Sequence, residues 1–307
     1  MNSTEKNINL PGLLNLFVVY IVWGSTYLAI RVAVQEDGGF APFILGFSRV
    51  IVAGTLLILW GVLRKERLKP NRQETITLVV SGLTLWVGGN GLVSWAEQRA
   101  NSGLAALIIA ATPIWVAIVE AMIDRKLPTL RMTAALLIGF GGIAVLTTPT
   151  LRQGVRADII SIVAILLAGL SWGIGSVVQS RRPVALTSVV SAGYQQLIGA
   201  IGFGFVILLL GETWSMPSPG VWLAWGYLVI FGSLFAFTAF IRALNLLPTK
   251  IVMTYPYVNP VIAVFLGWLI LKEAVTPWTL AGAALVLLGV AGVFYERARL
   301  ERAHAGG

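Results

Sequence analysis

The feature that most constrains the fold of this 307-residue chain is a series of long apolar stretches. Each ends in a short polar or Pro/Gly segment, and about 20 apolar residues in a helix suffice to cross a bilayer. Because 57% of the residues are hydrophobic and only 11% are charged, a soluble fold could not bury the apolar surface. We predict ten spans, at 13–34, 40–63, 74–95, 101–123, 130–148, 158–180, 187–210, 219–241, 249–271 and 277–296.

These spans are predicted to be helices. Backbone polar groups in lipid are satisfied only within helices or closed barrels. The apolar stretches are too long and too continuous for barrel strands, which would alternate apolar and polar residues. The predicted class is therefore an all-α integral membrane protein.

The second half of the chain repeats the order of the first. Thr112-Pro113 corresponds to Asn259-Pro260 at an offset of 147 residues, and Trp23-Gly24 corresponds to Trp172-Gly173 at a slightly larger one. Each repeat holds five spans, so the second must enter the membrane in the opposite orientation. Inverted repeats are typical of carriers that alternate access to a central site.

We therefore predict two inverted five-helix repeats. The first comprises residues 1–148, and the second comprises residues 149–307 with a polar cytoplasmic tail. The linker 149–157 is short, so the two repeats are expected to pack as one bundle.

The distribution of basic residues predicts the orientation of the chain. The segments on the same side as the N-terminus carry 16 of the 22 Lys and Arg residues, against five on the opposite side. Cytoplasmic loops carry such an excess, so both termini are expected in the cytoplasm. The net charge of +9 is thereby accounted for without a nucleic-acid partner.

Residues for metal or acid–base chemistry are scarce. The chain has no Cys, and its single His is His304 in the polar tail. No pair of carboxylates lies within a span, so we expect no metal and no cofactor. An intramembrane enzyme, which would need convergent Asp, Glu or His residues, is a remote alternative.

Prolines mark the strongest candidate for a transport site. Pro113 lies near the middle of span 101–123, and Pro256 and Pro260 lie near the middle of the corresponding span 249–271. An interior proline removes a helix hydrogen bond, which would free the carbonyls of Ile109, Val252 and Pro256. Matched interruptions in two repeats indicate a binding site or a hinge. Plain kinks satisfied by neighbouring groups are the alternative.

Polar and aromatic residues gather at mid-depth on six of the spans. Tyr255 and Asn259 are one helical turn apart, so they share a face, and Trp86 and Asn90 pair in the same way. The alternatives are lipid-facing packing for the aromatic residues and helix–helix hydrogen bonds for the amides. The candidate cavity residues are Trp23, Tyr27, Trp86, Asn90, Thr112, Trp172, Ser176, Ser233, Phe237, Tyr255 and Asn259.

Two charged residues lie within or close to the predicted membrane interior. Arg49 lies inside span 40–63 and is a candidate contact for an anionic substrate group, with snorkelling or pairing to backbone carbonyls as the alternative. Gln195-Gln196 stands where Arg49 would recur, so Arg49 has no symmetric partner. Glu120 comes closest of the acidic residues to the membrane interior and is the candidate coupling residue. Because no carboxylate lies at mid-membrane, we expect transport without a tightly coupled ion.

The motifs resemble those of a known family. Trp23-Gly24-Ser25, Arg49, Pro113, Asn259-Pro260 and Leu271-Lys272-Glu273 resemble EamA-type repeats of the drug/metabolite transporter superfamily. The chain is most similar to the YddG aromatic amino acid exporters of bacterial inner membranes. The resemblance implies a ten-helix carrier in which the first, third, fourth, sixth, eighth and ninth spans enclose the cavity.

The expected function is export of amino acids, above all aromatic and other apolar ones, and of related small metabolites. An aromatic, mostly uncharged pocket suits stacking with such side chains. A drug or other metabolite permease of the same fold is the main alternative. The expected partners are a small-molecule substrate and the bilayer of the bacterial inner membrane, with a monomer as one candidate assembly state.

Overall fold

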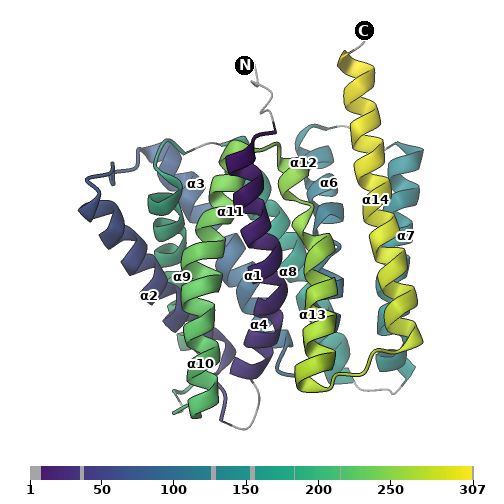
Figure 1. Cartoon of the computed structure of the whole chain (residues 1–307), viewed down its shortest axis with the longest axis horizontal. Helices are drawn as coiled ribbons and strands as arrows, with labels where there is room; N and C mark the ends of the chain where they lie inside the picture. The colour runs from purple at the N-terminus through teal and green to yellow at the C-terminus, as the bar shows by residue number, and fades with distance from the viewer. Residues whose placement is uncertain are drawn as a thin grey trace.

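The structure, a computed structural model, describes residues 8–34, 38–125, 129–152, 156–182, 184–214 and 216–305, and every regular element in these ranges is a helix. The first helix begins and the last helix ends at the same end of one bundle (Figure 1). In chain order the elements are α1 (Leu10–Ala33), α2 (Pro42–Leu63), α3 (Arg72–Gly82), η1 (Leu83–Gly91), α4 (Leu92–Ala96), α5 (Ser102–Ile109), α6 (Thr112–Ile123), α7 (Leu130–Arg152), α8 (Arg156–Arg181), α9 (Ser188–Leu210), α10 (Pro219–Tyr227), η2 (Leu228–Ala236), α11 (Phe237–Leu246), α12 (Thr249–Val252), α13 (Tyr255–Leu271) and α14 (Pro277–Ala305).

The all-helical class is confirmed, and each predicted span has a helical counterpart among the described residues. Seven helical segments in this part of the chain are long and apolar enough to cross a membrane. Three further apolar helices are shorter, at Leu130–Leu146, Tyr255–Leu271 and Pro277–Val293. Ten spans therefore remain a prediction for these last three.

Two stretches of π-helix interrupt the α-helical backbone. η1 joins α3 to α4, and η2 joins α10 to α11, so each lies in the middle of a long apolar segment. A π-helix has an i→i+5 hydrogen-bond pattern, which widens the turn and shifts the side chains that follow. Trp86 and Asn90 lie on η1, and Ser233 lies on η2. The two stretches thus hold candidate residues of the site.

Two other segments are broken rather than widened. α5 and α6 are separated at Ala110–Ala111, and α12 and α13 at Met253–Thr254. At the first break the Thr112 hydroxyl donates to the Ile109 carbonyl at 2.6 Å. The expectation that this carbonyl is free was wrong, because the threonine side chain turns back onto it. At the second break the Thr254 hydroxyl donates to the Ile251 carbonyl, also at 2.6 Å.

Paired helices flank the bundle. α2 packs along α9 at one side and α7 packs along α14 at the other, with α1, α8 and α13 between them (Figure 1). The α7–α14 contact depends on glycine, because a Cβ at Gly142 would lie 2.5 Å from the Val286 backbone nitrogen. Small residues allow such close helix contacts in membranes.

The buried side chains form two large clusters. One contains Tyr27, Ile30 and Val93, and the other contains Trp23, Trp172 and other aromatic residues. They meet inside the bundle, where α1 carries Trp23 into one cluster and Tyr27 into the other. The candidate site lies at this junction.

Candidate functional site

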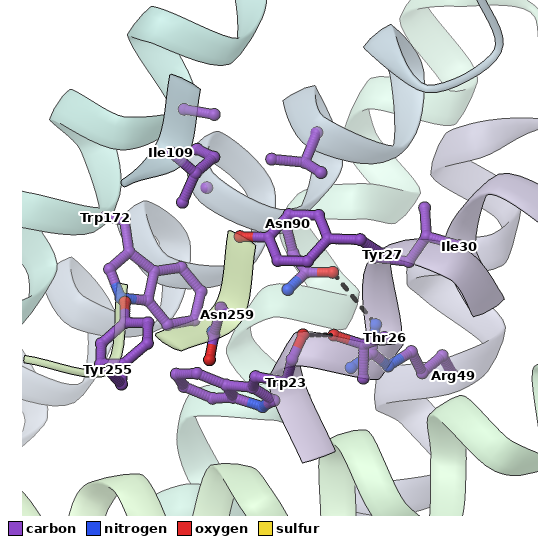
Figure 2. A pocket seen from close by; sticks show the side chains of 13 residues that line it. Trp23, Thr26, Tyr27, Ile30, Arg49, Asn90, Ile109, Trp172, Tyr255 and Asn259 are labelled. Carbon is purple, nitrogen blue, oxygen red and sulfur yellow. Dashed lines mark hydrogen bonds between the residues drawn. The ribbon is translucent and has the colours of Figure 1, made fainter. Parts of the chain in front are cut away.

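A small cavity of about 50 Å³ lies between the two clusters. About 10–15 Å³ of such space suffices for one water molecule, so the cavity has room for a few waters. Side chains from α1, α2, η1, α4, α5, α8 and α13 surround it (Figure 2). The lining residues are Trp23, Thr26, Tyr27, Ile30, Arg49, Gly89, Asn90, Val93, Ile109, Ala168, Trp172, Tyr255 and Asn259.

Seven residues singled out in the sequence meet at this cavity. Figure 2 shows them converging from five elements: Trp23, Tyr27, Arg49, Asn90, Trp172, Tyr255 and Asn259. Sequence reasoning missed the other six. Thr26 and Ile30 could have been found, because they lie three residues beyond Trp23 and Tyr27 on the same face of α1. Ile109 was singled out only for the carbonyl that Pro113 would free, and Val93 and Ala168 carry no comparable signal, since they are ordinary apolar helix residues.

Other candidates lie outside the lining. Thr112 and Ser176 are fully buried, and each hydroxyl donates to a carbonyl of its own helix segment. Trp86 and Phe237 pack against each other with ring centroids 4.8 Å apart, behind the cavity wall. Ser233 contacts the site only through Arg49.

One wall of the cavity is aromatic. The Trp23 ring lies 5.2 Å from the rings of both Trp172 and Tyr255, in edge-to-face geometry, and 4.9 Å from Phe240. These residues come from α1, α8, α13 and α11. Edge-to-face packing fixes the rings and presents apolar surface to the cavity.

The opposite wall carries a positive charge. Arg49 is only 3% exposed, and its Nε donates to Ser233 Oγ at 2.6 Å. Its Nη1 donates to Asn90 Oδ1 at 3.1 Å, as Figure 2 shows. The guanidinium also lies over the Trp86 ring, 5.1 Å from its centroid. All of these partners are neutral, and no carboxylate of the described residues forms an ion pair with Arg49. The site therefore holds a buried cation without an acidic counterion.

Asn259 joins two helices beside the cavity. When its side-chain amide is oriented with the nitrogen toward two backbone carbonyls, Asn259 donates to Tyr20 O at 3.1 Å and to Tyr255 O at 3.2 Å. Only 2% of its surface is exposed. The helix–helix bond proposed as an alternative is thus present, and the residue lines the cavity as well.

The prolines lie beside the helix breaks. Pro113 is in the first turn of α6 and Pro256 is in the first turn of α13, directly after the two interruptions. Pro260 lies inside α13. None of the three lines the cavity, so any effect they have on transport acts through the backbone.

The acidic residue chosen from the sequence lies away from this site. Glu120 is on α6, partly buried, and is not among the lining residues. A different carboxylate, Glu97, lies one turn beyond the lining residue Val93 and is completely buried. Sequence reasoning missed it because it stands directly after the end of an apolar stretch.

The lining residues can bind a solute but offer no general acid–base pair. They include no carboxylate, His, Cys or Lys. An anionic group can pair with Arg49 and accept further hydrogen bonds, while apolar groups can contact the aromatic wall. The site has the chemistry of a binding site for a solute with one anionic end.

The chain is similar to known membrane transporters. The model of the EamA-like transporter family matches residues 10–148 and again residues 159–295. The uncharacterized inner membrane transporter YedA of Escherichia coli K12 is 32% identical over 254 residues, which cover 82% of this chain and 80% of that protein. An S-adenosylmethionine/S-adenosylhomocysteine transporter of Chlamydia trachomatis is 23% identical over 297 residues, covering 92% and 89% of the two chains. A solved crystal structure with 21% identity has a TM-score of 0.66 and covers 94% of this chain, so it shares the fold.

Proposed function

Because the chain belongs to the EamA-like transporter family, and is thus a membrane transporter and not an enzyme, we propose that it exports amino acids by alternating access. The observation that carries this proposal is the buried Arg49 guanidinium at the cavity wall, which has neutral partners only. Burying a cation without a counterion is costly, so a site that keeps one gains most from an anionic ligand. The α-carboxylate of an amino acid is such a ligand.

The aromatic wall supports a preference within this class. A side chain that stacks on Trp23, Trp172 or Tyr255 would bury apolar surface and gain ring–ring contacts. Phenylalanine, tyrosine and tryptophan fit best, with other apolar amino acids next. This preference agrees with the resemblance to the YddG aromatic amino acid exporters.

S-Adenosylmethionine represents a second candidate class of substrate. S-Adenosylmethionine combines an α-amino acid group with an aromatic purine, and the transporter from Chlamydia trachomatis named for it is similar over 92% of this chain. Both of its parts would find partners in this cavity. It therefore belongs in any substrate panel.

The symmetry of the described helices supports two inverted repeats, residues 1–148 and 149–307. The π-stretches η1 and η2 begin at Leu83 and Leu228, and 228 − 83 gives an offset of 145 residues. Glu212 accepts hydrogen bonds from the first-turn nitrogens of α2, and Glu66 accepts one from Thr187 at the start of α9. These carboxylates are 146 residues apart (212 − 66), and each contacts the start of a helix in the other half of the chain, Glu212 through backbone nitrogens and Glu66 through the Thr187 hydroxyl.

Such symmetry suits alternating access. If the two repeats exchange conformations, the cavity opens to one side and then to the other. Movement is needed in any case, because a cavity of about 50 Å³ is smaller than the roughly 150 Å³ of a cavity that binds benzene, and it must widen for an amino acid. The breaks beside Pro113 and Pro256 are natural hinges for it.

We further propose an orientation with both termini in the cytoplasm of a bacterial cell and the bundle in the inner membrane, where the relative YedA resides. The excess of Lys and Arg on the side of the termini supports it. Cysteines introduced at Lys69 and Gln153 should label from opposite sides, with Lys69 labelled from the cytoplasm. Labelling of both from one side would contradict the orientation and the ten-span arrangement.

A competition panel tests the substrate class. The full chain is reconstituted in liposomes, and uptake of radiolabelled phenylalanine is measured against an excess of each amino acid, phenethylamine, S-adenosylmethionine and sugar nucleotides. We expect aromatic amino acids to compete best and phenethylamine, which lacks the carboxylate, to compete poorly. Equal competition by phenethylamine, or uptake that does not saturate, would contradict the proposal.

A further inference from the structure

Glu97 is the one carboxylate among the described residues that is fully buried with no hydrogen-bond partner on either oxygen. It follows the last residue of α4, at the end of the bundle opposite the start of α1 (Figure 1). Its backbone nitrogen donates to the carbonyl of the cavity residue Val93 at 2.9 Å. Glu97 thus lies one helical turn beyond a cavity residue and outside the set of residues assigned to the substrate.

The neighbours of Glu97 do not neutralise a negative charge. Arg31 of α1 acts electrostatically on Glu97, but its Nη1 donates to the backbone carbonyl of Glu97 and not to its carboxylate. Arg99, two residues along the chain, lies over the Trp95 ring. The Tyr27 hydroxyl, which lines the cavity, is also within electrostatic range.

A second carboxylate adds to the unfavourable environment. Glu273 follows α13 and accepts hydrogen bonds from the Ser102 nitrogen at 2.9 Å and from the Gly103 nitrogen at 3.2 Å. The Glu273 carboxylate is therefore hydrogen-bonded at the start of α5, and its negative charge acts on Glu97. Burial raises the pKa of Glu97 well above its usual range, Glu273 raises it further, and Arg31 acts in the opposite direction.

An ionised carboxylate without partners is among the most costly groups to bury, and such groups normally take up a proton. We propose that Glu97 is a proton-binding site, which holds a proton in this conformation and releases it to water when this end of the bundle opens, so that transport is coupled to proton movement. The oxygen–hydrogen bond of the acid breaks, the proton passes to water, and Arg31 stabilises the carboxylate that remains. This inference rests on the proposed transport function, and it replaces the expectation of uncoupled transport.

Coupling between proton and solute requires that the pKa of Glu97 differ between the closed and the open conformation. For each unit by which the pKa of Glu97 falls on opening, deprotonation favours the open form about tenfold. The position of Glu97 one turn from Val93 and near Tyr27 allows a solute in the cavity to sense the same movement. Proton and solute would thus bias one conformational equilibrium.

The first experiment requires no substrate. Infrared pH-difference spectra of the full chain in lipid should contain the carbonyl stretch of a protonated carboxylic acid at neutral pH, and Glu97→Gln should remove it. Glutamine has the shape of the protonated acid, so this variant should fold. Glu212→Gln is the matched control, because Glu212 is a partly buried carboxylate at the same end of the bundle and an amide oxygen can still accept from Phe43 and Ile44. Absence of the band in the wild type, or its persistence in Glu97→Gln, overturns the proposal.

The second experiment tests coupling with phenylalanine in liposomes under an imposed pH difference of one unit. One-for-one exchange with protons can drive accumulation of up to about tenfold. Glu97→Gln should lose this accumulation and keep phenylalanine counterflow, whereas Glu212→Gln should keep both. A sodium gradient that drives accumulation in place of the pH gradient, or unchanged pH-driven accumulation in Glu97→Gln, overturns coupling through this residue. If the wild type transports no amino acid, the proposed function fails while the infrared band still decides the proton site.

Discussion

Replacing Arg49 with methionine tests the central claim about the substrate site. Methionine keeps an apolar stem of similar length and removes the charge. A hydrogen bond to a charged group contributes about 1.5–3 kcal/mol, which corresponds to a roughly tenfold to 150-fold loss of affinity for a ligand carboxylate. Arg49→Lys keeps the charge but cannot donate to Ser233, Asn90 and a carboxylate with the same planar geometry, so an intermediate loss is expected.

Loss of affinity alone would not separate a binding role from a structural one. Ser233 Oγ and Asn90 Oδ1 both accept hydrogen bonds from Arg49, so the methionine variant leaves two polar groups with lost partners. Each unsatisfied buried group costs about 1–3 kcal/mol of stability. The melting temperature of each variant must therefore be measured beside its affinity.

A pair of ligands resolves the ambiguity. Phenylalanine and phenethylamine differ only by the carboxylate, so Arg49→Met should weaken phenylalanine binding. It should not weaken binding of phenethylamine, a cation that Arg49 repels. Dissociation constants are measured by calorimetry on purified protein, with Arg242→Met on the exposed face of α11 as a control for the loss of one charge. If Arg49→Met weakens both ligands equally, the arginine supports the structure of the site and does not bind the carboxylate.

Three further predictions follow from other parts of the structure. Asn90→Leu and Asn259→Leu should lower phenylalanine transport strongly with near-normal expression, because an amide beside the cavity is lost; wild-type uptake by both would contradict the site. Gly142→Val should lower the unfolding free energy by about 1–3 kcal/mol, because its Cβ would lie 2.5 Å from a backbone nitrogen of α14, whereas Gly141→Val, with nothing within 4 Å of its Cβ, should not. Because the pKa of Glu97 is raised, the protonated acid contributes to the unfolding free energy fully at low pH. This contribution is lost as the pH rises through the raised pKa. The melting temperature should therefore fall on that rise in the wild type and not in Glu97→Gln.

Most of the fold could be predicted from hydropathy, because lipid leaves helices as the main way to satisfy a long apolar backbone. The limits of each apolar run agree with the observed helices to within a few residues, apart from the longer extensions such as α14, which continues to Ala305. The π-stretches could not be predicted. The sequence of η1 has three glycines and that of η2 has one, so composition gives no common signal for the wider turn.

The site could be predicted in part, for a similar reason. Large aromatic, amide and charged residues at mid-depth stand out from an apolar background, and Trp23, Arg49, Asn90 and Asn259 line the cavity. Glu97 was not recognised, since depth in the membrane was judged from the ends of apolar stretches. The charges that act on it belong to Arg31 of α1 and to Glu273, which are distant in sequence.

The residues of the cavity differ between the two stretches that match the family model, residues 10–148 and 159–295. Trp23 and Trp172 are equivalent in the two repeats, and both line the cavity. Arg49 has Gln196 as its counterpart, and that amide donates to the Ser233 carbonyl at 3.3 Å. Asn90 corresponds to Phe237, which packs behind the wall.

This difference is what an asymmetric solute requires. If two equivalent repeats exchange conformations, the scaffold gains from being symmetric, because each facing state then has the same helix contacts in reverse. A solute with one charged end and one apolar end gains instead from a cavity that has one arginine and one aromatic wall. The matched spacing of the π-stretches, together with the asymmetry at Arg49 and Asn90, therefore favours a carrier for such a solute over a carrier for one that is uniformly apolar.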